Sequence, residues 1–183
     1  YDHTHPFHDP FVMFAYLAAI TERIEFATGV LILPQRQTVL VAKQAADLEL
    51  LSGGRLRLGV GVGWNYVEYD ALGQDFSRRG RRADEQIAFL RALWTGDVVS
   101  FDGQFDSIDR GVVIPGPRRP IPIWVGGFSS QAFTRGVSLI DGFIFAGDET
   151  RVNAALADLR SIAAAHGRDL DTFGLDFVAT GIT

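Results

Sequence analysis

The amino-acid sequence predicts an α/β fold built on a parallel sheet, and three observations carry this prediction. Strand-like and helix-like segments alternate along most of the 183 residues. The strand-like segments are apolar throughout rather than alternately apolar and polar, as expected of strands covered on both faces. Residues that disfavour regular structure end two of these segments: Pro34 ends the first, and Gly126 ends the third. Such alternation places parallel strands inside and helices outside, and both a doubly wound sheet and a barrel satisfy it.

The helices are recognised by capping residues and by apolar residues three or four positions apart. Asp9 and Pro10 suit the N-cap and the first helical position, so a helix is expected from there to Arg23. Further helices are expected at 38–51 with Thr38 as cap, at about 82–94, after Ser129 as cap, and at about 149–165. Strands are expected at 24–33, 56–63, 121–125, 141–146 and 173–179.

Residues 96–120 break this alternation. Glycines and prolines stand among short apolar pieces there: Gly96, Gly103, Gly111, Gly116, Pro115, Pro117 and Pro120. This pattern predicts a hairpin-like insertion over the scaffold rather than another strand and helix.

Composition and charge exclude several classes of protein. The sequence has no cysteine, which rules out a disulfide framework, a cysteine zinc site and a thiol nucleophile. With 17 Lys and Arg against 22 Asp and Glu, the net charge of -5 argues against a nucleic-acid partner. No apolar run approaches the roughly 20 residues of a membrane helix, and no export signal opens the chain, so a cytoplasmic protein is expected. The chain opens on Tyr1 rather than Met, and we expect it to be a piece of a longer protein.

Glycines gather where the second expected strand ends. Gly59, Gly61 and Gly63 do not match the dinucleotide fingerprint, because Trp64 and Asn65 follow where a further glycine and a helix are required. Packing of small residues inside a sheet explains the first two. The segment from Gly63 to Asn65 lies at the carboxyl end of a strand, where α/β folds bind ligands.

Two other glycine segments allow a structural or a functional interpretation. Gly126, Gly127 and Ser129 stand between a strand and a helix, either as an ordinary turn or as a phosphate site where free amides and the helix dipole converge. Gly29 lies inside an apolar strand, between Thr28 and Val30, and marks a bulge or a close backbone approach.

Charged clusters give weaker indications. His3, His5 and His8 with Asp2 and Asp9 lie in a proline-containing loop without regular spacing, so no metal site is expected. The basic run comprises Arg78, Arg79, Arg81 and Arg82. It is either a solvated loop or a contact for an anionic cofactor tail. His166 suits a structural role at a helix end. No catalytic residue can be named from spacing.

Several motifs, in order, resemble the bacterial luciferase-like monooxygenase family, in its deazaflavin (coenzyme F-420)-dependent oxidoreductase branch. They are Thr21-Glu22-Arg23-Ile24, Thr28-Gly29-Val30, Ala42-Lys43-Gln44, Leu51-Ser52-Gly53-Gly54-Arg55-Leu56, Gly59-Val60-Gly61-Val62-Gly63-Trp64-Asn65, Glu68 with Ala71-Leu72-Gly73, Arg79-Gly80-Arg81-Arg82, Leu93-Trp94-Thr95-Gly96, Pro120-Ile121-Pro122-Ile123-Trp124-Val125-Gly126-Gly127 and Asp141-Gly142. The resemblance is good from about Phe7 to Ala146 and weaker beyond.

The resemblance implies a (β/α)8 TIM barrel, incomplete in this chain, with its first strands and its last strand and helix missing. Residues 1–183 would then be part of a single luciferase-like TIM-barrel domain. The implied cofactor is coenzyme F-420, with FMN as the alternative, and the implied partners are a small-molecule substrate and a second copy in a homodimer. The implied cofactor-binding residues are Thr28, Gly29, Val30, Gly63, Trp64, Asn65, Gly126, Gly127 and Ser129, with a cis peptide before Val30.

The implied activity is transfer of hydride to, or activation of oxygen on, a small organic substrate. Trp64 stands where the sugar-phosphate dehydrogenase branch has a glutamate, which disfavours that substrate class. The family's Asp-His pair is expected upstream of Tyr1 rather than at Asp2 and His3. A non-catalytic cofactor-binding or partner barrel of the same family is the alternative. A phosphate-ligand lyase or isomerase is disfavoured, because Lys43, the single lysine, sits inside an expected helix.

Overall fold

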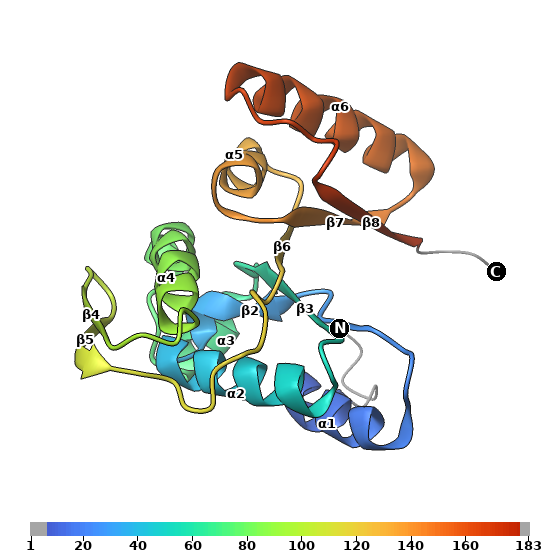
Figure 1. Ribbon diagram of the computed structural model, residues 1–183. Helices are drawn as coiled ribbons and strands as arrows, with labels where there is room; N and C mark the ends of the chain where they lie inside the picture. Colours follow the sequence, from blue (N-terminus) through green and yellow to red (C-terminus); the bar gives the residue numbers. More distant parts are fainter. Residues whose placement is uncertain (1–6, 180–183) are drawn as a thin grey trace.

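The computed structural model describes residues 7–179 (Figure 1). In the described part, six strands form a parallel sheet in the order β1-β3-β6-β7-β8, and β2 also pairs with β3. These strands are β1 (Phe26–Ala27), β2 (Leu31–Ile32), β3 (Leu56–Gly61), β6 (Ile123–Gly126), β7 (Gly142–Gly147) and β8 (Gly174–Ala179). The helices are α1 (Pro10–Ile20), α2 (Thr38–Leu51), α3 (Tyr66–Ala71), α4 (Arg79–Leu93), α5 (Ser130–Leu139) and α6 (Glu149–Ala165).

The strands are added in sequence order, with no reversal. Figure 1 shows α1, α2, α4, α5 and α6 following one another around one side of the sheet, and each packs on the next. A doubly wound sheet would need helices on both faces and a point where the strand order reverses. The structure therefore excludes that arrangement for the described residues and shows an α/β fold with part of a barrel-like parallel sheet.

The two faces of the sheet carry different side chains. Leu58, Val125 and Phe143 point to the helices and are buried in the main apolar core. On the opposite face, Arg57 of β3 pairs with Asp176 of β8 at 2.9 Å, between Nη1 and Oδ2. These strands lie three strand spacings apart, roughly 14 Å along the sheet. A side-chain ion pair over that separation spans the concave face, so the sheet is curled.

The expected strand at 24–33 forms as two short pieces, β1 and β2. The Thr28 hydroxyl donates to the carbonyl of Gly59 at 2.6 Å, in place of a regular ladder contact. The peptide between Gly29 and Val30 is cis, as the family resemblance implied. A 3-10 turn with Pro34 then ends the segment at Leu33–Gln35.

Other boundaries differ from expectation for local reasons. The first helix ends at Ile20, and β3 ends at Gly61 because Gly63 adopts a positive φ of 66°. Thr38 is not a cap: Gln37 holds that position, and the Thr38 hydroxyl donates to Asp106 at 2.7 Å. The short helix α3 was not expected.

The predicted hairpin is confirmed. Strands β4 (Val99–Asp102) and β5 (Ser107–Gly111) pair antiparallel and lie against α4. Glu85 of α4 accepts three backbone N–H groups of the hairpin tip, those of Gln104, Phe105 and Asp106, at 2.6, 2.8 and 2.9 Å. Burial raises the pKa of Glu85, but these three donors outweigh it, and the net pKa lies below the ordinary value of 4.5.

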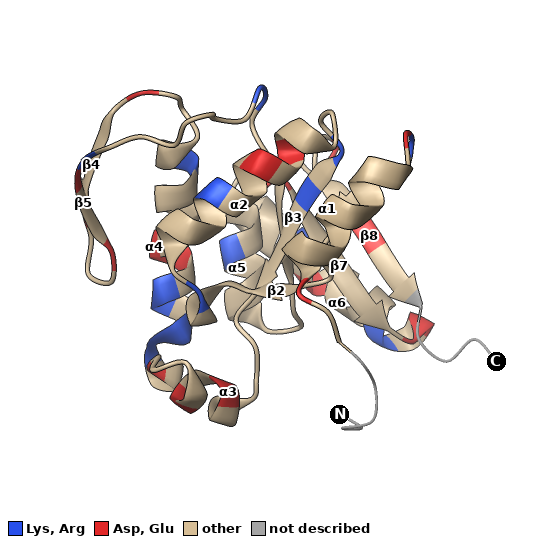
Figure 2. Cartoon of the chain, turned by 90° about the horizontal axis from the view of Figure 1, so that it is seen from below, with Lys and Arg blue, Asp and Glu red and all other residues tan. Residues whose placement is uncertain are grey.

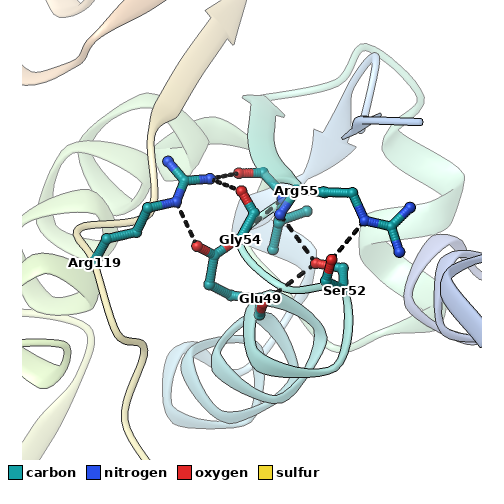
Figure 3. Close-up of polar contacts among 6 residues, drawn as sticks. Glu49, Ser52, Gly54, Arg55 and Arg119 are labelled. Atoms are coloured by element: carbon teal, nitrogen blue, oxygen red, sulfur yellow. Dashed lines mark hydrogen bonds and ion pairs between the residues drawn. The ribbon is translucent and has the colours of Figure 1, made fainter. Parts of the chain in front are cut away.

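The amino-terminal edge of the sheet is closed by a polar network (Figure 3). Glu49, at the end of α2, is 2% exposed and accepts the backbone N–H of Leu56 at 3.1 Å. Its other oxygen lies 2.7 Å from Nε of Arg119, whose Nη2 donates to the carbonyls of Gly54 and Leu56. Arg55 caps the end of α1 through the carbonyls of Ala18 and Thr21.

Between residues 7 and 179, the structure contains no helix with the length and apolarity that a bilayer crossing requires.

Candidate functional site

A cavity of about 970 Å³ opens at the carboxyl ends of the strands. The ends of β3, β6 and β7 and the first turns of α4 and α5 surround it. Seven of the nine predicted site residues line it: Gly29, Val30, Gly63, Trp64, Gly126, Gly127 and Ser129. The strand ends thus bring together three segments that are far apart in the sequence.

The floor of the cavity is shaped by Val30 and two glycines. A Cβ added at Gly61 would lie 2.6 Å from Cγ2 of Val30, and one at Gly126 would lie 2.8 Å from Cγ1 of the same residue. Neither position has room for a side chain while Val30 stays in place. Val30 therefore lies against two positions that carry no side chain, and an apolar flat group can approach the backbone there closely.

Gly59 has a different role from Gly61. A Cβ at Gly59 would collide with the carbonyl of Thr28 and lie 2.7 Å from Cδ1 of Ile144. Gly59 is therefore needed for packing between the strands. Thr28 itself is 3% exposed and does not line the cavity, because its hydroxyl is directed to the Gly59 carbonyl.

One wall of the cavity is the turn that leads from β6 into α5. Ser129 is the N-cap of α5, as predicted, and its hydroxyl accepts the N–H of Ala132 at 3.2 Å. A Cβ at Gly127 would lie 2.9 Å from that of Ala132, so the backbone passes tightly over the first turn of the helix. The positive end of the α5 dipole therefore faces the cavity.

Three arginines line the cavity and give it a cationic side. Arg135 is bound to Asp84 and to the carbonyl of Gly80. Arg151 lies over the ring of Phe128 at 3.9 Å. Arg79 lies over the ring of Phe76 at 3.8 Å, and its buried Nε has no hydrogen-bond partner within residues 7–179.

The arginines of the basic run do not act together in the structure, because their side chains have different surroundings. Figure 2 shows its residues at the beginning of α4, next to α3. Arg79 lines the cavity, whereas Arg78 lies over the ring of Phe105 at 4.4 Å and Arg82 reaches the carbonyl of Arg36 at 3.5 Å. Sequence reasoning missed Arg135 of α5 and Arg151 of α6, because no local pattern distinguishes them from arginines on the exposed face of a helix.

The rim of the cavity is built by the segment after β3. Trp64 lines the mouth and remains 69% exposed. Asn65 does not line the cavity: its side chain caps α3 at the N–H of Val67, at 3.2 Å, and donates to Glu68 at 3.0 Å. We therefore assign Asn65 a positioning role in the rim.

Tyr69 fixes α3 to the end of β3. Its side chain is fully buried, and its hydroxyl donates to the carbonyl of Val62 at 2.5 Å. Burial raises the pKa of Tyr69 to about 12, although the charges of Arg79 and Arg82 act in the opposite direction. Tyr69 thus holds the backbone beside Gly63 and Trp64 as a neutral hydrogen-bond donor.

The cavity wall that the structure describes contains arginines as its ionisable groups, and no carboxylate, histidine or lysine lines it. Lys43 lies in α2 and pairs with Asp47 at 2.7 Å. Within residues 7–179 no three His, Cys, Asp or Glu residues are grouped as a metal site would require, and Asp9 instead caps α1 and pairs with Arg36. Asp2, His3 and His5 lie outside the described residues. Within residues 7–179, the cavity therefore combines an apolar lining with cationic groups, and arginine is the only ionisable residue type in its wall.

His166 has the structural role expected of it. Its Nδ1 lies 2.8 Å from the carbonyl of Ile162 at the end of α6, far in sequence from the cavity segments.

Comparisons with known proteins agree on one family. The model of the family described as luciferase-like monooxygenase matches residues 1–183. An uncharacterised protein of Mycobacterium tuberculosis (strain ATCC 25618 / H37Rv) is 39% identical over 164 residues, which cover 89% of this chain and 57% of that protein. An FMNH2-dependent dimethylsulfone monooxygenase of Pseudomonas putida is 33% identical over 157 residues, covering 82% of this chain and 43% of that enzyme.

A solved structure has the same fold at low sequence identity. An F420-dependent secondary alcohol dehydrogenase, in complex with an F420–acetone adduct, superposes with a TM-score of 0.85 at 17% identity, over 97% of this chain and 56% of that one. The chain thus spans about half the length of the proteins it matches. Taken with the curled parallel sheet and the cavity at its carboxyl edge, the match of the family model over the whole length means that this chain belongs to the luciferase-like monooxygenase family.

Proposed function

We propose that this chain forms the cofactor-holding part of a flavin- or deazaflavin-dependent oxidoreductase that acts on a small organic substrate. Coenzyme F-420 is the cofactor we favour, and FMN is the alternative. The observation that carries the proposal is the combination of an apolar floor, with glycines at Gly61 and Gly126, and an arginine-lined wall at the carboxyl edge of the sheet.

The residues present fit such a cofactor. The cavity volume of about 970 Å³ lies at the upper end of the range for small-molecule sites, about 300 to 1,000 Å³. Any side chain at Gly61 or Gly126 would meet Val30 and fill the floor. The guanidinium of Arg79, which lines the cavity, and the first turn of α5 supply positive charge and N–H donors for a phosphate.

We assign the nine predicted residues unequal roles in this proposal. Gly29 and Val30 would support the ring, Trp64 would limit the space beside it, and Gly127 with Ser129 would contact the phosphate. Gly63 and Gly126 would allow close approach of the backbone. Thr28 and Asn65 would not contact the cofactor. Thr28 would hold the segment between β1 and β2 against β3, and Asn65 would hold the rim by capping α3.

When bound, the reduced cofactor would supply the hydride, or the electrons for oxygen activation. This chain's own share would be to position the ring, to exclude water with Trp64 and Val30, and to neutralise the phosphate. Proteins that this chain resembles use either cofactor. A relative in sequence is an FMNH2-dependent monooxygenase, and a structural neighbour is an F420-dependent dehydrogenase.

A second candidate is a barrel of the same family that binds cofactor without catalysing a reaction. The observation that favours it is that the described cavity wall carries no acid or base. In the oxidoreductase, we expect that group to come from the segment upstream of Tyr1.

We further propose that the complete protein is a cytoplasmic homodimer whose single domain closes as an eight-stranded barrel. The outer face of α1 supports a contact with a second copy. Val12, Tyr16 and Ile20 are spaced four residues apart on that face and are 71%, 65% and 62% exposed.

The test is titration of the full-length protein with FMN and with coenzyme F-420, followed by absorbance and fluorescence. Gly127→Val should abolish binding, because the new side chain meets Ala132 in the first turn of α5. Ser129→Ala should weaken binding, whereas Ser161→Ala, on the exposed face of α6, serves as the control. A folded wild-type protein that binds neither cofactor would contradict the proposal.

A further inference from the structure

A carboxylate joins two loops at the carboxyl edge of the sheet. Glu68 of α3 accepts Nε2 of Gln35 at one oxygen, at 2.9 Å, and Nδ2 of Asn65 at the other, at 3.0 Å. Gln35 ends the 3-10 turn that follows β2, and Asn65 caps α3 after β3. The contact between Gln35 and Glu68 therefore connects segments that are 33 residues apart in the sequence.

The two loops are not held equally firmly. The turn after β2 is fixed in the core, because Leu33 and Pro34 are buried. The helix α3 has only 6 residues, and a helix of that length has little stability of its own. Its buried Tyr69 donates to the carbonyl of Val62, which belongs to the same segment of the chain. Glu68 thus ties a short helix to a turn that the core holds in place.

Both loops carry residues that line the main cavity. Val30 directly precedes β2, whereas Gly63 and Trp64 lie between β3 and α3. The loops also meet in an apolar contact, since a Cβ at Gly63 would lie 3.0 Å from Cγ2 of Ile32. Glu68 adds a polar contact between the same two loops, so its hydrogen bonds bear on the space between Val30 and Trp64.

We propose that Glu68 is a positioning residue of this site. Its two hydrogen bonds hold the loop that carries Trp64 against the turn after β2, and so set the width of the cavity mouth. Glu68 does not line the cavity, and it acts through Asn65 and α3 rather than by contact with a ligand. Its effect on the affinity for a cofactor rests on the proposed function, whereas its hold on α3 is a property of the free protein.

The test breaks this contact from the side of Gln35 and then restores it. Gln35→Glu places two carboxylates against each other, and their repulsion should release α3. The double variant Gln35→Glu with Glu68→Gln restores the contact. The amide introduced at position 68 donates to the carboxylate at position 35, and its oxygen still accepts Nδ2 of Asn65. The matched control is Gln37→Glu, which adds the same charge at a nearby exposed position.

Two quantities are measured on the full-length protein: hydrogen exchange of the backbone amides, and the dissociation constants of FMN and coenzyme F-420. In Gln35→Glu, the amides of α3 should exchange about fivefold faster, while those of β3 and β6 keep the wild-type rate, because the opening is local. The cofactor that the wild type binds should bind about threefold more weakly. The double variant and the control should match the wild type in both measurements.

Three outcomes would overturn the inference. In the first, the amides of α3 exchange equally fast in Gln35→Glu and in Gln37→Glu. In the second, the double variant behaves like Gln35→Glu. In the third, α3 exchanges faster but the affinity for the cofactor is unchanged, so that α3 does not set the mouth. If the wild-type protein binds neither cofactor, the proposed function fails, and the exchange rates of α3 alone decide whether Glu68 holds the rim.

Discussion

The two edges of the parallel sheet use arginine in opposite ways. At the amino-terminal edge, Arg119 lies against the buried Glu49 and donates to the carbonyls of Gly54 and Leu56 (Figure 3). At the carboxyl edge, Arg79 lines an open cavity and keeps a buried Nε without a partner in the described part of the chain. In barrels of parallel strands, the amino-terminal edge serves the stability of the fold, and the carboxyl edge carries the binding site.

The largest effect should come from breaking the stabilising edge. Arg119→Met would leave the carboxylate of Glu49 buried without its ion-pair partner. Because the Arg119 side chain is itself 43% exposed, the loss should be smaller than for a fully buried pair, about 2 kcal/mol. Urea unfolding measures it, with Arg118→Met as the neighbouring exposed control. If the two variants were equally stable, the ion pair between Glu49 and Arg119 would not stabilise this edge of the sheet.

The floor of the cavity offers a test of packing at the other edge. Gly61→Ala should destabilise the protein by about 1 to 2 kcal/mol, because the new Cβ meets Val30. Adding Val30→Ala should recover most of this loss, although Val30→Ala alone should destabilise. Chemical unfolding of the four proteins in a double-mutant cycle gives the coupling energy. Additive effects would mean that Val30 and Gly61 do not share the floor.

The rim of the cavity should respond more weakly. Tyr69→Phe removes the donor to the Val62 carbonyl and should lower the free energy of unfolding by about 1 kcal/mol. Because that contact positions the segment beside Trp64, the intrinsic fluorescence of the folded protein should shift too. Tyr66→Phe, at an exposed position of the same helix, is the control. An unchanged spectrum would show that α3 is held without this hydrogen bond.

The smallest effect concerns the hairpin, which belongs to neither edge. The folded-state pKa of Glu85 lies below 4.5, so its stabilisation is complete above pH 4.5 and is lost as the pH falls through the lowered pKa. Stability should therefore fall with acidification below pH 4.5 less steeply in Glu85→Gln than in the wild type. Unfolding free energies at a series of pH values from neutral to acidic test this. Parallel profiles would contradict the anchoring role of Glu85.

Most elements of the fold could be predicted because their signals are local. The helix at Glu149–Ala165 has its apolar residues at helical spacing, and it forms as expected. The strand around Gly29 could not be predicted in detail, because its interruption depends on the distant carbonyl of Gly59. Thr38 illustrates the same limit: its hydroxyl is engaged by Asp106 of the hairpin rather than by its own helix.

The candidate site was predictable where glycines mark strand ends. Gly63, Gly126 and Gly127 line the cavity because parallel strands end at one edge. Arg135 and Arg151 could not be identified, since a helical arginine has the same local sequence signal whether it faces solvent or a cavity. Asn65 was assigned to the cavity from its place at the end of an expected strand and from the family resemblance, but a helix that was not foreseen, α3, uses its side chain as a cap.

The central claim, that one edge binds and the other stabilises, is tested most directly by measuring two quantities on two variants. Arg79→Gln and Arg119→Gln should be compared for cofactor affinity and for free energy of unfolding. The account predicts that Arg79→Gln weakens binding about tenfold, by loss of a charge-assisted hydrogen bond, with little change in stability. It also predicts that Arg119→Gln lowers stability and leaves affinity intact. Loss of affinity in Arg119→Gln with unaltered binding in Arg79→Gln would contradict it.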